Sequence, residues 1–342
     1  MNVKWKKGLM ALFGSSVLVL AACGNNTAAP EKEEDNNEPA QQQEEEKTYK
    51  IGVTQFVDHP SLNAAYDGFK KALEDSGLKV EYDEQNAQGD QNNTSTIATN
   101  LVNAGVDLIF ANATPSAQSV ASATKDIPIV FTSVTDAVGA ELVESMEKPG
   151  GNVTGTIDTH PDAIPNSVKF LSEELGAKKV GMVYNAGEQN SVAQINTVKD
   201  TIKKEKLDLN IVEAPVSTSA EVKQATESLI GKVDSIYIIT DNTVVSALES
   251  VISVANDNKL PLMVGELDSL KKGGFAAYGF EYYDIGYEAG EMAVKILKGE
   301  AKPAEMPVQA PQNLMLMVNK KTADTIEKEI KDEWEAEVYE GE

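Results

Sequence analysis

The sequence is poor in the residues that form covalent crosslinks, metal sites and strong anion clamps. It has one cysteine, two histidines and no arginine among 342 residues. A single cysteine excludes an internal disulfide and every motif that needs two thiols. Without arginine, bidentate guanidinium contacts to carboxylate or phosphate are excluded as well. An anionic ligand must therefore be held by other donors.

The motifs of common enzymes and cofactor sites are also missing. There is no G-x-S-x-G elbow, no G-x-x-x-x-G-K-[ST] phosphate loop and no H-E-x-x-H motif. His59 and His160 both precede proline in expected turns, and a zinc site would need further carboxylates at no recognisable spacing. We therefore predict no enzyme, no cofactor and no metal. A hydrolase that uses paired carboxylates stays as an alternative.

Positive charge is scarce relative to negative charge. The formal net charge is −24 and the isoelectric point is near 4.5. Because affinity for nucleic acid depends on cations that neutralise phosphates, this balance opposes binding to DNA or RNA. The sequence therefore predicts partners other than nucleic acid.

The N-terminus has the pattern of a secretory signal. Three lysines, Lys4, Lys6 and Lys7, precede an apolar run of about 15 residues from Gly8 to Ala22, which is too short for a comfortable membrane span. The run ends in Leu-Ala-Ala-Cys, which resembles the lipobox of bacterial lipoproteins. That resemblance implies a signal peptide over residues 1–22, cleavage before Cys23 and a lipid on its sulfur. Residues 23–47, acidic and without aromatic or large aliphatic side chains, are expected to form a disordered tether.

After the tether, strand-like apolar runs alternate with helical patterns, which predicts parallel sheets made of βαβ units. The first series has strands at 49–56, 78–87, 106–114 and 127–136, with helices at 62–76, 90–104 and 116–124. The second series has strands at 178–187, 207–216, 233–242 and 260–266, with helices at 191–205, 219–231 and 244–256. Residues 106–120 align with 233–248, and 127–136 with 260–268, which indicates an internal duplication. The predicted fold class is α/β, with two doubly wound parallel-sheet lobes joined by a hinge.

Polar side chains gather where the expected strands end. In open parallel sheets, ligands bind outside the carboxyl ends of the strands, near the N-termini of the following helices. Each cluster alone also fits a plain helix N-cap, because Ser, Thr, Asn and Asp are preferred there. Six clusters at one edge of two lobes favour a ligand cleft. The clusters are 55–61, 112–116, 133–136, 185–191, 240–243 and 265–266.

Several segments together resemble one known family. These are QFVDHPSLNAAYDGF, NATPSAQ, PIVFTSVTD, NVTGTID, ITDNTVVSALESV and YGFEYYDIGYEAGEMA. They are similar to ABC-transporter substrate-binding lipoproteins associated with tryptophan and other aromatic amino acids. The resemblance implies a periplasmic-binding-protein fold of type I, with three crossings between lobes, near Thr156, Ala277 and Gln309. The implied lobes are residues 48–155 plus 278–308 and residues 156–277 plus 309–342.

An amino-acid ligand suits the chemistry of these strand ends. Thr114, Ser116 and Thr135 are candidates for its α-carboxylate, since hydroxyls and helix N-termini can hold an anion without arginine. Asp241 is the first candidate for its α-ammonium, followed by Glu266 and Asp158. An aromatic ring is expected to lie against one of four residues, and five further residues complete the predicted site. The ring candidates are Phe56, Phe131, Tyr278 and Tyr282, and the others are Gln55, Ser61, Asp136, Asn185 and Asn242.

The resemblance thus implies a lipid-anchored receptor that closes on an aromatic amino acid, with tryptophan favoured. Its expected partners are the permease and ATPase subunits of an ABC importer, and it is expected to be monomeric. The predicted location is the outer face of the cytoplasmic membrane of a Gram-positive cell. A sugar or nucleoside receptor on the same fold is the alternative, although neither tryptophan, Trp5 or Trp334, lies near the cleft to stack on a sugar. The acidic tail 326–342 carries no recognised motif and is expected to be a fraying surface helix.

Overall fold

The computed structural model describes residues 47–341. The predicted signal peptide, the lipid attachment at Cys23 and the tether up to residue 46 lie outside the described residues. No helix within 47–341 has both the length and the apolar character needed to cross a membrane.

The first lobe is built on a five-stranded sheet in the order β2-β1-β3-β4-β5, in which every pair is parallel. The strands are β1 (Thr48–Gln55), β2 (Lys79–Asn86), β3 (Leu108–Asn112), β4 (Ile129–Val134) and β5 (Val153–Ile157). Gln55 at the end of β1 is level with Asn86 of β2 and Asn112 of β3. Three polar residues therefore end neighbouring strands at the carboxyl edge of this sheet.

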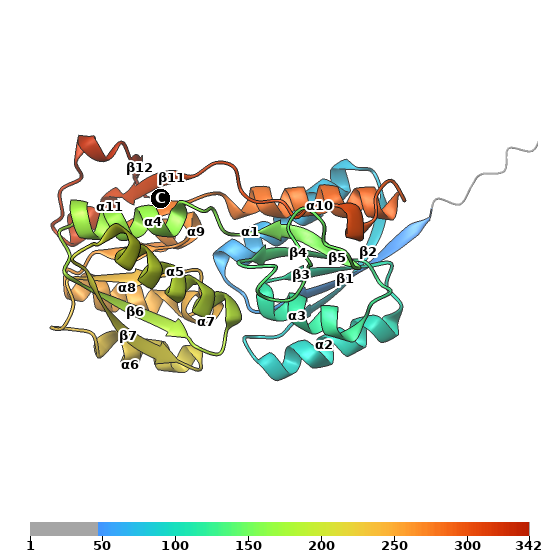
Figure 1. The fold of residues 1–342 in the computed structure, drawn as a ribbon, viewed down its shortest axis with the longest axis horizontal. Coiled ribbons are helices and arrows are strands. Elements are labelled where there is room, and N and C mark those ends of the chain that lie inside the picture. Colours follow the sequence, from blue (N-terminus) through green and yellow to red (C-terminus); the bar gives the residue numbers. More distant parts are fainter. Residues whose placement is uncertain (1–46, 342) are drawn as a thin grey trace, which may run out of the picture. The chain divides into compact units, whose positions relative to one another are not determined.

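Four helices belong to this lobe, and one of them comes from much later in the chain. They are α1 (Pro60–Asp75), α2 (Gln91–Ala104), α3 (Thr114–Ala123) and α10 (Tyr282–Leu297). Glycines let α10 lie against α1 backbone to backbone, since a Cβ at Gly286 would be only 1.8 Å from the Ala65 carbonyl oxygen. This contact fixes the returning segment to the first lobe (Figure 1).

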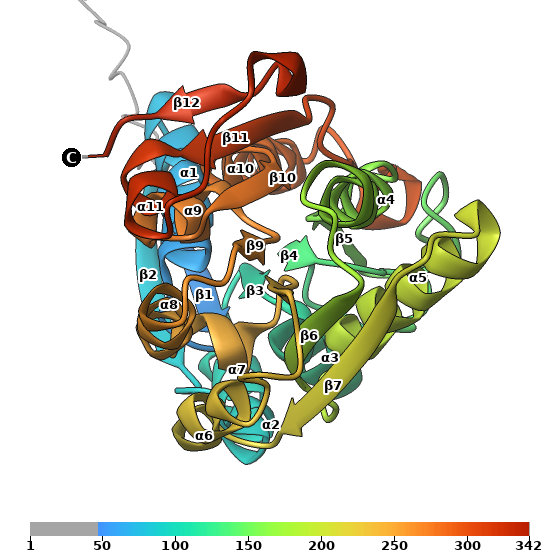
Figure 2. The ribbon, with the colours of Figure 1, turned by 90° about the vertical axis from the view of Figure 1, so that its left-hand side faces the viewer.

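The second lobe contains a seven-stranded sheet in the order β12-β11-β10-β9-β8-β6-β7, in which only the β10–β11 pair is antiparallel (Figure 2). Its strands are β6 (Lys179–Asn185), β7 (Asn210–Val216), β8 (Ser235–Ile238), β9 (Leu262–Val264), β10 (Ala276–Gly279), β11 (Met315–Asn319) and β12 (Glu337–Tyr339). Its helices are α4 (Ala163–Lys169), α5 (Gln189–Glu205), α6 (Val222–Glu227), α7 (Asn242–Val245), α8 (Leu248–Asp257), α9 (Leu267–Lys272) and α11 (Lys320–Thr325). A π-turn, η1 (Phe170–Glu174), extends α4, and 3₁₀ turns occur at η2 (Ser219–Glu221), η3 (Pro303–Glu305) and η4 (Asp332–Trp334).

The two sheets share a strand order over their first four strands. The order β2-β1-β3-β4 in the first lobe matches β7-β6-β8-β9 in the second. The segments that aligned in the sequence, 106–120 with 233–248 and 127–136 with 260–268, thus carry corresponding strands. Each sheet is covered by apolar clusters on both faces, which explains why its central strands are continuous apolar runs. The predicted α/β class with two doubly wound lobes is confirmed.

Three chain segments connect the sheets. The first follows β5, the second joins β10 to α10, and the third lies between η3 and β11. An isolated parallel bridge joins Thr156, near the end of β5, to Gln309 of the third segment. The hinge region therefore consists of three connecting segments rather than of a single linker.

The prediction for the acidic tail was wrong. Instead of a fraying helix, the tail adds β12 to the sheet, parallel to β11, and buries Trp334 at 7% exposure. The Trp334 ring lies edge-on to Phe170 and Phe275, at centroid distances of 5.0 and 6.3 Å, and its Nε1 donates to Glu174 Oε2 at 2.9 Å. The prediction failed because it followed the charged composition of the tail and gave no weight to Trp334, the large apolar side chain that holds the segment on the second lobe. The helix expected over 244–256 is also divided, because α7 ends at Val245 and α8 begins at Leu248.

Candidate functional site

The carboxyl edge of the first sheet holds two residues in a backbone conformation that is unusual for them. Ala113 has φ +84° and Ser133 has φ +55°, although neither is glycine. Such conformations persist where the surrounding structure requires them, often at functional sites. They place the first turn of α3, which follows β3, next to the end of β4.

Two hydroxyl groups at this edge are buried without a hydrogen-bond partner among the described residues. They are Thr114 Oγ1 and Ser133 Oγ, on residues that are 1% and 5% exposed. No side chain in the described part of the chain caps the N-terminus of α3, and Pro115 stands in its first turn. Ser116 receives only a long hydrogen bond, 3.4 Å, from Thr54.

Thr135 and Asp158 form a pair rather than separate ligand groups. Thr135 Oγ1 donates to Asp158 Oδ1 at 3.0 Å, and the Tyr282 hydroxyl donates to Asp158 Oδ2 at 2.9 Å. Burial raises the pKa of Asp158 to about 6, and the two hydrogen bonds oppose that rise. In this conformation both oxygens of the carboxyl group are engaged by the first lobe and by α10.

Asp241, the first candidate for the α-ammonium, is fully buried and bound on all sides by its own lobe. Its Oδ1 accepts from Val244 N at 2.8 Å, which caps α7. Its Oδ2 accepts from Asn185 N and from Ser191 Oγ, both at 2.6 Å. Burial, and then the charge of Glu188, raise its pKa to about 7. In this conformation Asp241 therefore orders the edge of the second lobe.

Glu188 was missed, although it lies within the polar cluster that follows β6. It is 2% exposed, and its Oε1 accepts from Thr243 N at 3.1 Å and Thr243 Oγ1 at 2.7 Å. Its Oε2 accepts from Asn242 Nδ2 at 2.6 Å. Glu188 therefore ties the start of α5 to α7. An acidic residue directly before a helix was the only signal for it in the sequence.

The two residues after Glu188 were also missed as candidates. Gln189 Oε1 and Asn190 Oδ1 are buried acceptors with no hydrogen-bond partner among residues 47–341. Both lie in the first turn of α5, which contacts α3 of the other lobe. Partnerless hydroxyls on α3 and β4 thus have counterparts in partnerless acceptors on α5, and the first lobe adds one partnerless acceptor of its own, Asn112 Oδ1.

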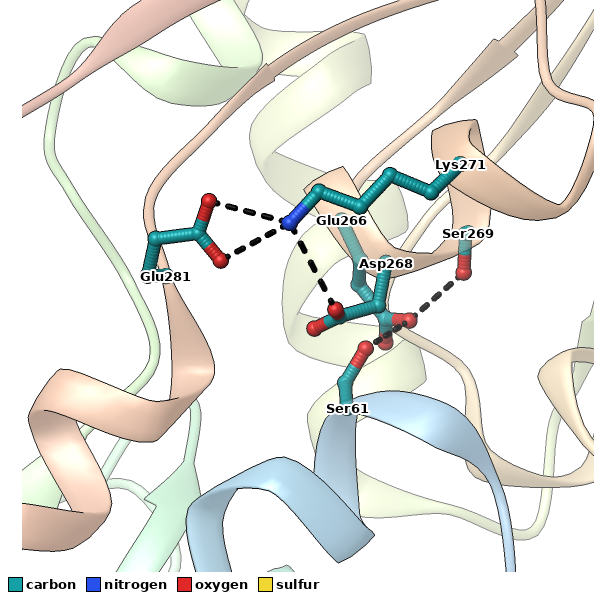
Figure 3. Close-up of polar contacts among 6 residues, drawn as sticks. All are labelled: Ser61, Glu266, Asp268, Ser269, Lys271 and Glu281. Carbon is teal, nitrogen blue, oxygen red and sulfur yellow. Dashed lines mark hydrogen bonds and ion pairs between the residues drawn. The ribbon is translucent and has the colours of Figure 1, made fainter. Parts of the chain in front are cut away.

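Two side-chain contacts join the start of α1 in the first lobe directly to the second lobe. Ser61 Oγ, at the start of α1, donates to Glu266 Oε2 at 2.7 Å (Figure 3). His59 Nε2 lies 3.4 Å from Asn242 Oδ1, while its Nδ1 accepts from Leu62 N and caps α1. Burial lowers the pKa of His59 to about 4, so the ring is neutral and its Nε2–H donates to Asn242. Ser61 and Glu266, both predicted to bind the ligand, bind each other here.

The remaining predicted residues are spread around the cleft. Gln55 donates to Asn63 Oδ1 at 2.7 Å and lines a groove of about 480 Å³ beside α1. Phe56 and Asn185 line a cavity of about 790 Å³ between the lobes. Asp136 accepts from Gly139 N at 2.8 Å in a turn.

The four aromatic candidates separate into two groups. Phe131 is fully buried in the core of the first lobe, and Tyr282 is 1% exposed and stacks on Phe280. Tyr278 and Phe56 border spaces between or beside the lobes. Phe56 is itself 2% exposed and belongs to the same apolar core as Phe131, so what distinguishes Phe56 and Tyr278 from the other two is that each borders one of these spaces. Among residues 47–341, no group of three or more His, Cys, Asp or Glu side chains could hold a metal ion.

Two α/β lobes that face each other with polar strand ends, joined by three segments, define a two-lobed solute-binding protein. The chain belongs to the family described as ABC transporter substrate binding protein, whose model matches residues 50–338. This confirms the family resemblance of the sequence. Proteins of this family bind small solutes outside the cytoplasm and work with ABC transporters.

Individual relatives are similar over most of their length. A "Tyrosine-binding protein" from Clostridioides difficile is 44% identical over 286 residues, or 82% of this chain and 81% of the relative. A crystal structure of an ABC domain in complex with L-Trp from Streptococcus pneumoniae has a TM-score of 0.80 at 35% identity, covering 86% of this chain and 100% of that one. A ligand-free, open substrate-binding protein with adhesive properties from Clostridium difficile has a TM-score of 0.63 at 40% identity, with the same coverage.

The last two comparisons bear on the arrangement of the lobes. The open structure is closer in sequence but less similar in three dimensions, at equal coverage. The present structure is therefore more similar in three dimensions to the ligand-bound relative than to the open one, and its lobes touch directly through Ser61 and Glu266 and through His59 and Asn242.

Proposed function

We propose that this protein is the receptor of an ABC importer for an aromatic amino acid. The observation that carries the proposal is a set of buried groups without partners: the hydroxyls of Thr114 and Ser133 with the acceptor Asn112 Oδ1 on one lobe, and the carbonyl acceptors of Gln189 and Asn190 on the other. An α-carboxylate needs donors and an α-ammonium needs acceptors, so an amino-acid zwitterion would satisfy both sets when the lobes close. Asp241 would act indirectly, by holding the start of α7.

The aromatic side chain is supported by the relatives, one named for tyrosine and one holding L-Trp. Phe56 and Tyr278 are the proposed ring contacts. The cavity that Phe56 lines, about 790 Å³, is large enough for an aromatic side chain, whereas the space beside Tyr278 is only about 20 Å³. We therefore expect Phe56→Ala to weaken binding more than Tyr278→Ala.

Binding of purified protein to tryptophan, tyrosine, phenylalanine, ribose, galactose and nucleosides by thermal shift and calorimetry tests the proposal. A ligand at a hundred times its dissociation constant adds about 2.7 kcal/mol to stability. Thr114→Val and Ser133→Ala should each weaken binding of the preferred amino acid by about 10- to 100-fold, since each removes a hydrogen bond to a charged group. Thr99→Val on the exposed face of α2 is the matched control. Binding of sugars or nucleosides alone would refute the amino-acid assignment.

The cellular setting is part of the same proposal. We place the protein on the outer face of the cytoplasmic membrane of a Gram-positive cell, attached through lipid on Cys23, where it delivers its ligand as a monomer to permease and ATPase subunits. The lipobox-like Leu-Ala-Ala-Cys and the acidic segment after it support this. Cys23→Ser should move the protein from the membrane fraction to the medium. Persistence of the variant in the membrane would contradict the anchor.

A further inference from the structure

Glu266 lies at the meeting point of the two lobes and accepts two similar hydrogen bonds. Ser61 Oγ, from α1 of the first lobe, and Ser269 Oγ, from α9 of the second, each donate to Oε2 at 2.7 Å (Figure 3). Only the bond from Ser61 crosses between lobes. Glu266 is 2% exposed, so this contact is shielded from competing water.

The surroundings of Glu266 are rich in carboxyl groups and poor in cations. Burial, and then the charge of Asp268, raise the pKa of Glu266 to about 7, against the hydrogen bonds from both serines. Asp268 Oδ2 is itself buried with no hydrogen-bond partner in the described part of the chain. Lys271 lies 3.9 Å from Asp268 Oδ1 but 3.0 Å from both oxygens of Glu281, so its charge is shared (Figure 3). The titratable groups that face this region are Asp268 and Lys271 on α9, His59 before α1, Asp158 after β5, and Glu281 and Tyr282 at the start of α10.

We infer that Ser61 and Glu266 form a latch that holds the lobes closed without a ligand, and that the latch is strongest when Glu266 carries a proton. Both hydrogen bonds end on Oε2, so a proton can occupy Oε1 without disturbing either. This proton removes the negative charge of Glu266, which otherwise lies close to those of Asp268 and Asp158. When the lobes separate, Glu266 loses Ser61 and gains water, and its carboxyl group returns toward its ordinary pKa.

The sign of the pH effect follows from this. Because the closed state holds the proton more tightly than the open state, closing takes up a proton, and the latch weakens as pH rises through 7. His59 acts in the opposite direction, since its lowered pKa in the closed state means that closing releases a proton below pH about 6.5. A comparison with a variant that lacks only the titration of Glu266 separates the two.

The test measures the open and closed populations without any ligand. Spin labels on Ser95→Cys of α2 and Gln224→Cys of α6, both exposed, report the distance between the lobes by pulsed EPR, with Cys23→Ala removing the natural thiol. Ser61→Ala should reduce the closing constant by about 5- to 10-fold, the usual effect of one buried hydrogen bond. Ser269→Ala removes a bond of equal length to the same oxygen within one lobe, so it should change the closing constant less than Ser61→Ala does.

The proton is tested with Glu266→Gln, which keeps an acceptor for Ser61 but does not titrate. The ratio of the closing constants of the wild-type protein and this variant should rise about tenfold from pH 8 to pH 6. An unchanged distribution in Ser61→Ala, equal opening in Ser269→Ala, or a fully open wild-type protein would overturn the latch. A pH-independent ratio would overturn the role of the proton. Because no ligand is present, these outcomes are independent of whether the amino-acid assignment holds.

Discussion

Replacement of Trp334 tests whether the acidic tail is an integral part of the second lobe. Trp334→Ala removes a side chain that is 7% exposed and packed on Phe170 and Phe275. Burial of about 200 Å² at about 25 cal/mol/Å² is worth about 5 kcal/mol, and substitutions of this kind in other proteins have cost about 3–5 kcal/mol. We expect a loss of about 4 kcal/mol in the free energy of unfolding.

The matched variant is Trp334→Phe, which keeps an aromatic ring but loses the Nε1 donor to Glu174. Glu174 is partly exposed and can be hydrated, so this variant should lose only about 1 kcal/mol. Denaturation by guanidinium, followed by far-ultraviolet circular dichroism, measures both. For about 300 residues unfolding together, 4 kcal/mol corresponds to a midpoint lower by about 6 °C. If both variants lost less than about 1 kcal/mol, the packing of the tail would be refuted.

Two further predictions concern His59 and the contact between α1 and α10. The difference in the free energy of unfolding between the wild-type protein and His59→Asn should shrink by about 2 kcal/mol from pH 7.5 to pH 5. The reason is that the histidine of the unfolded chain is protonated near pH 6.5, whereas that of the folded protein is protonated only near pH 4. Denaturant titrations at both pH values measure this difference, and a constant value would contradict the neutral buried ring. Gly286→Ala should lower the free energy of unfolding by about 3 kcal/mol, because the added Cβ would overlap the Ala65 carbonyl. The control is Gly151→Ala, whose Cβ would meet nothing within 4 Å and which should change this free energy by less than about 0.5 kcal/mol. Equal effects of the two variants in thermal denaturation would rule out the close contact between the helices.

The amino-acid sequence by itself determined the class of fold and the family. Alternation of apolar strands and amphipathic helices follows from local periodicity, and two similar series of elements predicted two similar lobes. The same reasoning located the ligand edge, because the carboxyl ends of parallel strands lie at one side of a sheet whatever their lengths. Composition alone excludes internal disulfides and guanidinium clamps.

Tertiary structure alone decided what each polar residue does at that edge. All four of the following residues lie in polar clusters after strands. The carboxyl groups of Asp241 and Glu188 accept hydrogen bonds within the second lobe, whereas the hydroxyls of Thr114 and Ser133 have no hydrogen-bond partner among the described residues. Ser61 and Glu266 are 205 positions apart and meet only because the lobes close. The burial of Trp334 likewise could not be predicted from its charged neighbours, because it depends on packing against Phe170 and Phe275, which are distant in the sequence. Local pattern fixes which groups reach the cleft, but which of them remain available depends on contacts between residues far apart in the chain.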